Sequence, residues 1–236
     1  MERQDLVIAG IGNASGGKYN LVKIAGNGSL NGEIDCIDLI IQGNAKIHGN
    51  VKAKVTHVSG TARLQGALRS EIMKIQGNAS IDGDVECKEI RFQGSGKVKR
   101  NLSGNEVYIH GGSKIIGDCT AEIFEVKGSF NIGGLLNAGN IQITMFGSCQ
   151  AKEIGGENIE VKKQRMNLIK KLLFNIHIGL SADSIEGDEI YLEHTKAKVV
   201  RGNQVTLGPG CEIELVEYKN SFQFDKGSKI GSYKQL

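Results

Sequence analysis

Hydrophobic and polar residues alternate along much of this chain, and the alternation itself recurs with a fixed period. Within one repeat, which runs from residue 43 to residue 59, every second position is small or apolar over a stretch of eleven residues. The inward positions are Ala45, Ile47, Gly49, Val51 and Ala53, followed after a slip of one position by Thr56 and Val58. A period of two residues predicts short β-strands with one buried face, and the slip predicts a bend between them.

Glycine marks the start of each repeat, and the period is 17 residues. The repeated glycines are Gly26, Gly43, Gly60, Gly77, Gly94, Gly111 and Gly128. Short strands of this kind cannot bury an apolar face alone, but a stack of them can. We therefore expect an all-β fold, a parallel β-helix with coils of about 17 residues between residues 26 and 144.

The 17-residue register ends after residue 144, and a second pattern replaces it. The motif [IV]-x-G-x-x-[IV]-x-[LV] occurs three times, at residues 154–161, 185–192 and 200–207. We expect residues 1–144 to form a regular β-helix with an N-terminal cap strand. Residues 145–236 are expected to continue the β-helix less regularly, with an insertion at about residues 162–180.

The insertion carries the helix signal of this chain. Residues 162–178 contain five lysines or arginines and no acid, and several of their apolar residues share one face of a helical projection. This pattern predicts a short basic amphipathic segment. It contacts an anionic membrane surface or a partner, or it packs its apolar face against the solenoid, and both interpretations are open. The candidate contact residues are Lys162, Lys163, Arg165, Leu168, Ile169, Lys170, Lys171, Leu172, Leu173 and Ile176.

Composition agrees with a thin core built from paired strands. The chain has 33 glycines, one proline and no tryptophan, and proline would remove donors from a strand ladder. The net charge of +3 does not suggest nucleic-acid binding. The first residues do not resemble an export signal, so we expect a cytoplasmic protein. The five cysteines lack C-x-x-C spacing and are expected to be buried and reduced, without a metal or cofactor.

Two features of the sequence bear on enzymatic chemistry. Residues 12–18 nearly form a phosphate-binding loop, but Tyr19 follows Lys18 where a serine or threonine would be needed, and no helix pattern follows. Left-handed β-helix acyltransferases also stack short coils, but they need a six-residue period and a catalytic histidine. We therefore expect no enzyme. An acyltransferase-like enzyme and a monomeric or oligomeric β-solenoid adaptor are the alternatives.

A stack of coils has two ends, and each end exposes unpaired backbone groups and an apolar cross-section. Unless the ends are capped, they favour assembly with further copies. The predicted polymer interface consists of Val22, Ile24, Leu30 and Ile34 at one end, and of Phe222, Phe224 and Ile230 at the other. The segment Leu6–Ile8 is expected to be a cap or an added strand.

The motif G-x-A-x-[IL]-x-G-x-V-x-[AC], present at residues 43–53 and 77–87, resembles that of the bactofilins, a family of polymer-forming bacterial cytoskeletal proteins. The resemblance covers residues 21–144, and the later part resembles a longer subgroup of the family. It implies a right-handed, three-sided β-helix that forms head-to-tail filaments without nucleotide, as a scaffold in cell shape or motility. The partners it implies are further copies, a paralogous bactofilin and the inner face of the cell membrane; it brings no catalytic residues.

Overall fold

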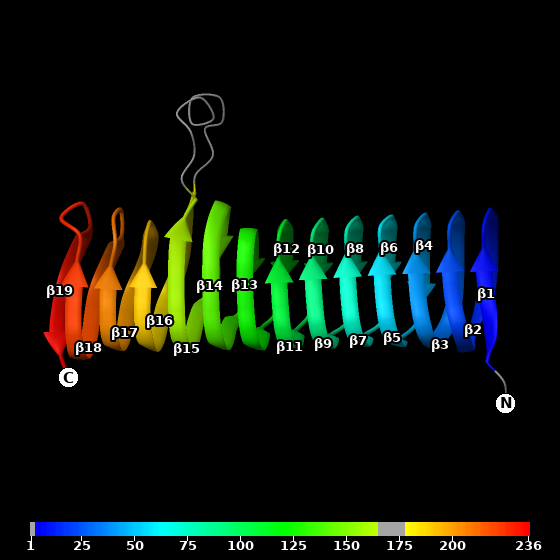
Figure 1. The fold of residues 1–236 in the computed structure, drawn as a ribbon, viewed down its shortest axis with the longest axis horizontal. Coiled ribbons are helices and arrows are strands. Elements are labelled where there is room, and N and C mark those ends of the chain that lie inside the picture. Colours follow the sequence, from blue (N-terminus) through cyan, green and yellow to red (C-terminus); the bar gives the residue numbers. More distant parts are fainter. Residues whose placement is uncertain (1–2, 165–177) are drawn as a thin grey trace, which may run out of the picture. The chain divides into compact units, whose positions relative to one another are not determined.

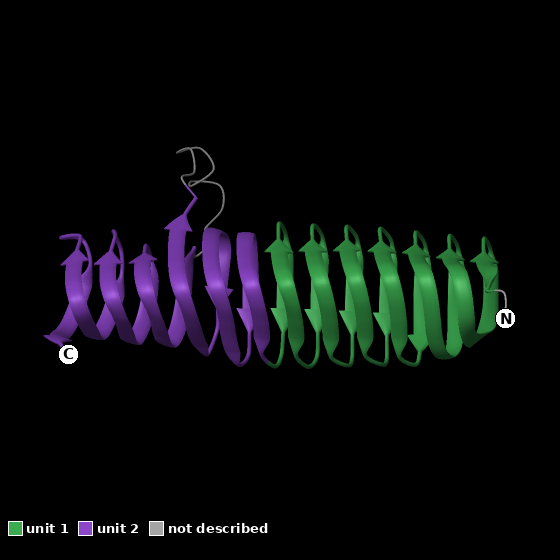
Figure 2. Cartoon of the chain, turned by 60° about the horizontal axis from the view of Figure 1, so that its bottom comes forward, with its two compact units in different colours: residues 1–117 green, residues 118–236 purple. Residues whose placement is uncertain are grey.

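The structure, a computed structural model, describes residues 3–164 and 178–236, and the regular secondary structure of these residues consists of β-strands. The chain divides into two compact units, residues 1–117 and residues 118–236 (Figure 2). In each unit the strands wind into successive coils of a parallel β-solenoid (Figure 1). The predicted fold class, a parallel β-helix with coils of about 17 residues, is confirmed.

From residue 3 onward, where the structure describes it, the first unit contains twelve strands. They are β1 (Gln4–Ile8), β2 (Ile11–Ile24), β3 (Asn27–Ile41), β4 (Asn44–His48), β5 (Val51–Val58), β6 (Thr61–Leu64), β7 (Leu68–Ile75), β8 (Asn78–Ile81), β9 (Val85–Phe92), β10 (Ser95–Val98), β11 (Leu102–Ile109) and β12 (Gly112–Ile115). Neighbouring coils pair residues that lie 17 positions apart, such as Val51 with Leu68 and Leu68 with Val85. Each inward column of the sequence pattern therefore becomes a column of stacked side chains.

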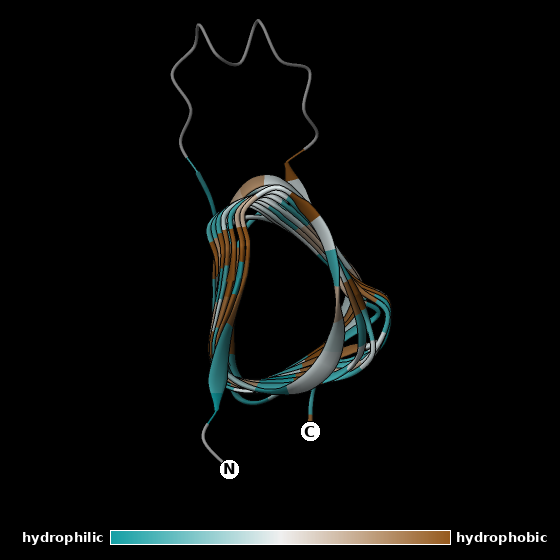
Figure 3. Cartoon of the chain, turned by 90° about the vertical axis from the view of Figure 1, so that its right-hand side faces the viewer, coloured by the Kyte–Doolittle hydropathy of each residue, from teal (hydrophilic) through white to brown (hydrophobic). Residues whose placement is uncertain are grey.

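Burial divides each coil of the first unit into three inward runs. In the coil of β4 and β5, the run in β4 is followed by two runs in β5, one on each side of the exposed Val55. Viewed along the stacking direction, the coils enclose a cross-section with three sides (Figure 3). We call the side formed by β4, β6, β8, β10 and β12 the first wall. The beginnings of β5, β7, β9 and β11 form the second wall, and their ends form the third.

The repeated glycines lie where consecutive coils approach most closely. The Gly43 carbonyl accepts a hydrogen bond of 2.9 Å from the Thr61 amide of the next coil. A Cβ atom at Gly60 would overlap that carbonyl oxygen and would lie 2.6 Å from the Gln42 carbonyl oxygen. The same overlap recurs at Gly77 and Gly94, each against the glycine one coil earlier. The period-17 glycine is therefore required for space between backbones.

The second unit contains seven strands among its described residues. They are β13 (Cys119–Ile132), β14 (Leu135–Gln150), β15 (Glu153–Lys163), β16 (Gly179–Leu192), β17 (Thr195–Leu207), β18 (Glu212–Phe224) and β19 (Lys229–Gln235). The three copies of the second motif stack on one another, with Ile154 beside Ile185 and Ile185 beside Val200. The sequence change after residue 144 falls within β14, inside this unit.

The core of both units is aliphatic, with a few rings. Phe92 in the first unit is 1% exposed, while Phe124 and Phe130 in the second are 0% and 2% exposed and meet edge to face at 5.6 Å. Among the residues that the structure describes, no helical segment has the length and apolar composition that crossing a lipid bilayer requires.

Candidate assembly interface

The second unit presents an open coil edge at its last strands. Pairing between β18 and β19 ends with Tyr218 beside Gln235, so the end of β18, residues 221–224, pairs with β17 alone among the described strands. Phe224 and Tyr233 are 48% and 57% exposed at this edge. An edge strand with unpaired backbone groups and exposed rings is a template for pairing with another chain.

Four aromatic side chains gather at this edge. Phe222 lies at the centre, with ring centroids 5.6 Å from Tyr218, 5.4 Å from Phe224 and 5.3 Å from Tyr233. The Phe222 and Phe224 rings stack with an interplanar angle of 22°. Phe222 and Phe224 were predicted from the sequence, as was Ile230, which is half-buried and pairs with Ile213. The two tyrosines were missed, although Tyr233 lies in the inward column of Val216.

A ladder of charges fixes the last coil. Glu217, which is 6% exposed, accepts a hydrogen bond of 2.6 Å from Arg201 Nε and lies 2.7 Å from Lys234 Nζ. Arg201 also contacts Glu186 at 3.2 Å, so the ladder spans four consecutive coils. Hydrogen bonds from Lys234 and Arg201 lower the pKa of Glu217, which keeps the carboxylate charged. The four ladder residues are separated by 15, 16 and 17 positions, because the coils differ in length. The ladder could therefore not be recognised from the sequence alone.

The first unit has an exposed edge of its own, which lies further toward the N-terminus than the sequence pattern suggested. Strand β1 pairs with the end of β2, placing Leu6 beside Val22 and Ile8 beside Ile24. Leu6–Ile8 is therefore an added strand, one of the two expected outcomes. The predicted interface residues Val22, Ile24, Leu30 and Ile34 lie one coil inside this edge and are at most 2% exposed.

The exposed edge of the first unit is formed by β1 and the beginning of β2. Val7 is 56% exposed and Ile11 is 91% exposed. Residues 12–18, which nearly match a phosphate-binding loop, lie within strand β2 and pair with β3. This segment is strand rather than the glycine-rich corner that its sequence suggested, and no helix follows it among the described residues of this unit.

The predicted basic insertion is described only at its two ends, residues 162–164 and 178–180. Lys162 belongs to β15, forms an ion pair with Glu160 and lies 5.7 Å from the centroid of the Tyr191 ring. The Lys163 amide donates a hydrogen bond of 3.0 Å to Glu193. The remaining candidate contacts lie outside the described residues: Arg165, Leu168, Ile169, Lys170, Lys171, Leu172, Leu173 and Ile176.

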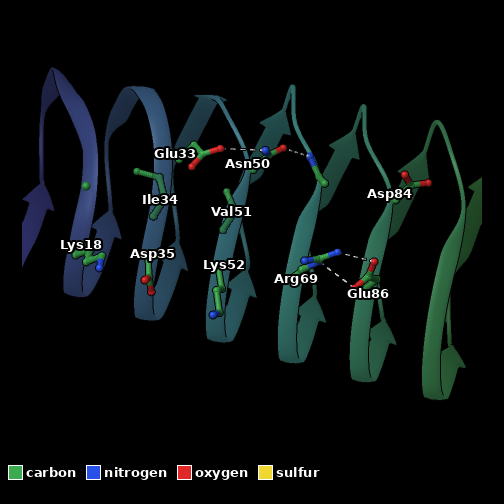
Figure 4. A pocket seen from close by; sticks show the side chains of 12 residues that line it. Lys18, Glu33, Ile34, Asp35, Asn50, Val51, Lys52, Arg69, Asp84 and Glu86 are labelled. Atoms are coloured by element: carbon green, nitrogen blue, oxygen red, sulfur yellow. Dashed lines mark hydrogen bonds and ion pairs between the residues drawn. The ribbon is translucent and has the colours of Figure 1, made fainter.

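The second wall of the first unit carries a groove of about 610 Å³, and four of its lining side chains pair with one another (Figure 4). Arg69 Nε lies 2.9 Å from Glu86, and Asn50 donates a hydrogen bond of 3.2 Å to Glu33 (Figure 4). Cations and carboxylates are mixed along this groove.

Two histidines in the first unit contact the side-chain amides of glutamines. His48 and His57 each lie 2.8 Å from a glutamine side-chain oxygen, of Gln65 and Gln76 respectively. Gln76 also donates to Gln93 at 3.1 Å, so part of an amide ladder forms along the coils. Among the described residues there is no cluster of three metal-binding side chains. The contacts of His48 and His57 join neighbouring coils.

The cysteines lie in the core of both units and are all free. Burial raises the pKa of Cys36, Cys87 and Cys119 to about 12, and that of Cys149 to about 11. Since the thiolate is the reactive form, a raised pKa and a closed core both suppress reactivity near neutral pH.

We expect the native protein to react with a thiol reagent at pH 8 on the order of 100-fold more slowly than the unfolded protein. Titration with Ellman's reagent, with and without 6 M guanidinium chloride as the denaturing arm, measures this difference. Rapid modification of any cysteine in the native protein would show that its coil opens, contrary to the packing described here.

Fold and edge together define a class, the parallel β-solenoids with an open, aromatic coil edge. A family model described as "Bactofilin: Polymer-forming cytoskeletal" matches residues 4–103. The chain is 50% identical to the uncharacterized protein YhbE of Bacillus subtilis (strain 168) over 236 residues, which cover 99% of this chain and 98% of YhbE. The chain belongs to the bactofilin family, as the sequence resemblance predicted.

A second relative matches part of the chain. Over 98 residues the chain is 42% identical to the uncharacterized protein YhbF of the same strain, covering 41% of this chain and 40% of YhbF. No solved structure matches this chain. Membership of a polymer-forming cytoskeletal family supports a scaffold and self-assembly.

Proposed function

We propose that this protein is a cytoskeletal scaffold that assembles end to end into filaments without nucleotide. The observation that carries the proposal is the open edge of the second unit. There the end of β18 has a strand partner on one side, and the exposed ring of Phe224 stacks on Phe222. A further coil placed against this edge would complete the strand pairing and cover the rings.

The family supports this proposal, since its description is that of polymer-forming cytoskeletal proteins. The proposal places the filament in the cytoplasm, with free and buried cysteines that need no oxidising compartment. Cell shape and motility are the processes that the family resemblance suggests for such filaments. A paralogous bactofilin and a membrane contact through residues 162–178 stay predictions.

We expect the substitution Phe224→Glu, alone or with Phe222→Glu, to abolish filaments while the protein stays folded. A carboxylate at the edge would have to lose its water on assembly, which costs several kcal/mol per ion unless it is paired. Electron microscopy and sedimentation without nucleotide or metal measure the result, and circular dichroism confirms the fold.

A matched control is available in the same unit. Phe146 is 49% exposed, as Phe224 is at 48%, but Phe146 lies within β14, away from the edge strands β18 and β19. The substitution Phe146→Glu is expected to leave filaments intact. Filaments that persist in Phe224→Glu would overturn the proposed edge, and uniform monomers in the unmodified protein would favour the adaptor alternative.

A further inference from the structure

The first wall of the first unit is unusually basic. The five strands of this wall, each taken together with the residue that follows it, carry five cationic side chains and one carboxylate. The charged residues are Lys46, Arg63, Asp82, Lys97, Lys99 and Lys114. The side chains of all five cations are exposed, so this wall presents a positive surface to its surroundings.

Four of these cations form one column. Lys46 pairs in register with Arg63, Arg63 with Ser80, Ser80 with Lys97, and Lys97 with Lys114. Neighbouring strands lie about 4.8 Å apart, so like charges in this column repel one another at short range. Placing them together costs stability in the isolated unit, and a negatively charged partner would remove that cost.

Ion pairs leave most of this charge uncompensated. Asp82 contacts Lys99 at 3.0 Å and Arg63 at 3.7 Å. Lys46, Lys97 and Lys114 have no carboxylate within 4.0 Å among the described residues. On the other walls of this unit some cations do pair with an acid of a neighbouring coil, as Arg69 does with Glu86 at 2.9 Å.

The second unit carries a surface of opposite charge on two neighbouring coils. Glu157 in β15 and Asp188 and Glu189 in β16 are exposed, and none of the three forms an ion pair with a described residue. Glu189 lies beside Asn158, so these carboxylates occupy neighbouring coils. Asp188 accepts a hydrogen bond of 2.6 Å from Asn203, which fixes its position. We call this set the acidic corner.

We propose that the first wall of one copy binds the acidic corner of a second copy, in a side-to-side contact that is distinct from end-to-end assembly. Neighbouring coils have the same spacing on both surfaces, so cations on one copy can face carboxylates on two neighbouring coils of the other. The wall has no exposed aromatic residue with which nucleic-acid bases could stack. A lipid surface could supply negative charge but has no repeat that matches the coil spacing. Binding to lipid vesicles distinguishes this partner from a second copy.

The experiment uses the full chain in the Phe222→Glu, Phe224→Glu background, so end-to-end assembly does not contribute. Sedimentation measures self-association at 50 mM and 500 mM salt, and we expect the contact to be lost at high salt because screening shortens to a few ångströms. The variant K46E/K97E/K114E and the variant E157K/D188K/E189K are each expected to associate at least tenfold more weakly. Mixed together, they should associate again, because the reversed wall then faces a reversed corner.

The control reverses three cations on the other walls of the same unit, K52E/K54E/K74E, and should leave association unchanged. If a mixture of the wall variant and the corner variant did not associate, the proposal would be overturned. It would also be overturned by a result in which wall reversal abolishes binding to phosphatidylglycerol vesicles but leaves self-association unchanged, since the wall would then serve a lipid surface. Circular dichroism of each variant checks that the coils stay folded.

Discussion

The substitution Gly60→Ala is expected to destabilise the first unit by about 4 kcal/mol or more, enough to prevent folding in a chain of ordinary stability. The added Cβ atom would overlap the Gly43 carbonyl oxygen and approach the Gln42 carbonyl oxygen to 2.6 Å. Neither atom belongs to a flexible side chain, so relief requires two coils to separate and to lose hydrogen bonds such as that from the Thr61 amide to the Gly43 carbonyl.

Thermal denaturation followed by circular dichroism measures this loss. Gly10→Ala is the matched control, because a Cβ atom at Gly10 would meet nothing within 4 Å. It should leave the melting temperature within about 2 °C of the unmodified protein, since exposed changes away from packing features usually cost little. If Gly60→Ala had the same melting temperature as Gly10→Ala, the coils would have to be further apart at this position than the structure places them.

The second large effect is a coupling between Phe92 and Gly96. The column that contains Ala45, Ala62 and Ala79 has glycine at position 96, next to the largest side chain of the neighbouring column. A Cβ atom at Gly96 would overlap the Phe92 ring and lie 3.1 Å from Phe92 Cζ. The glycine therefore makes room for the phenylalanine.

We expect Gly96→Ala alone to cost about 1–3 kcal/mol from overpacking. In the Phe92→Ile background, which restores the residue type of the neighbouring coils, the same change should cost little or stabilise. Denaturant unfolding of the four proteins of this cycle gives the coupling energy, with an expected value of about 1–3 kcal/mol. Strictly additive effects would contradict the packing of this pair.

Much of the fold of the first unit follows from the sequence, because its coils have constant length. With a period of 17 residues, Gly43, Gly60 and Gly77 stack, and the inward alternation around them specifies which side chains are buried. The three copies of the second motif also stack as their shared pattern indicated, although Asp188 and Asn203 pair at a separation of 15 residues.

The candidate site was only partly predictable. At the N-terminal edge, residues 11–17 are rich in glycine and lack apolar alternation, so the added coil could not be recognised, and the predicted residues Val22 and Ile24 lie one coil inside. At the edge of the second unit, Phe222 and Phe224 could be proposed from the sequence because they repeat Val205 and Leu207, with which they pair. The basic first wall could not be recognised from the sequence, because its cations are far apart along the chain. They share one side of the unit only in the folded coils.

The parallel pairing has a mechanical consequence. Hydrogen bonds between coils run along the direction in which the coils stack, as between Val51–Val58 and Leu68–Ile75. Tension along that direction loads all the bonds between two neighbouring coils at once, so no single bond bears the force. Each unit is therefore built as a stiff element that resists stretching, and its resistance depends on every junction in the series, with the weakest junction giving way first.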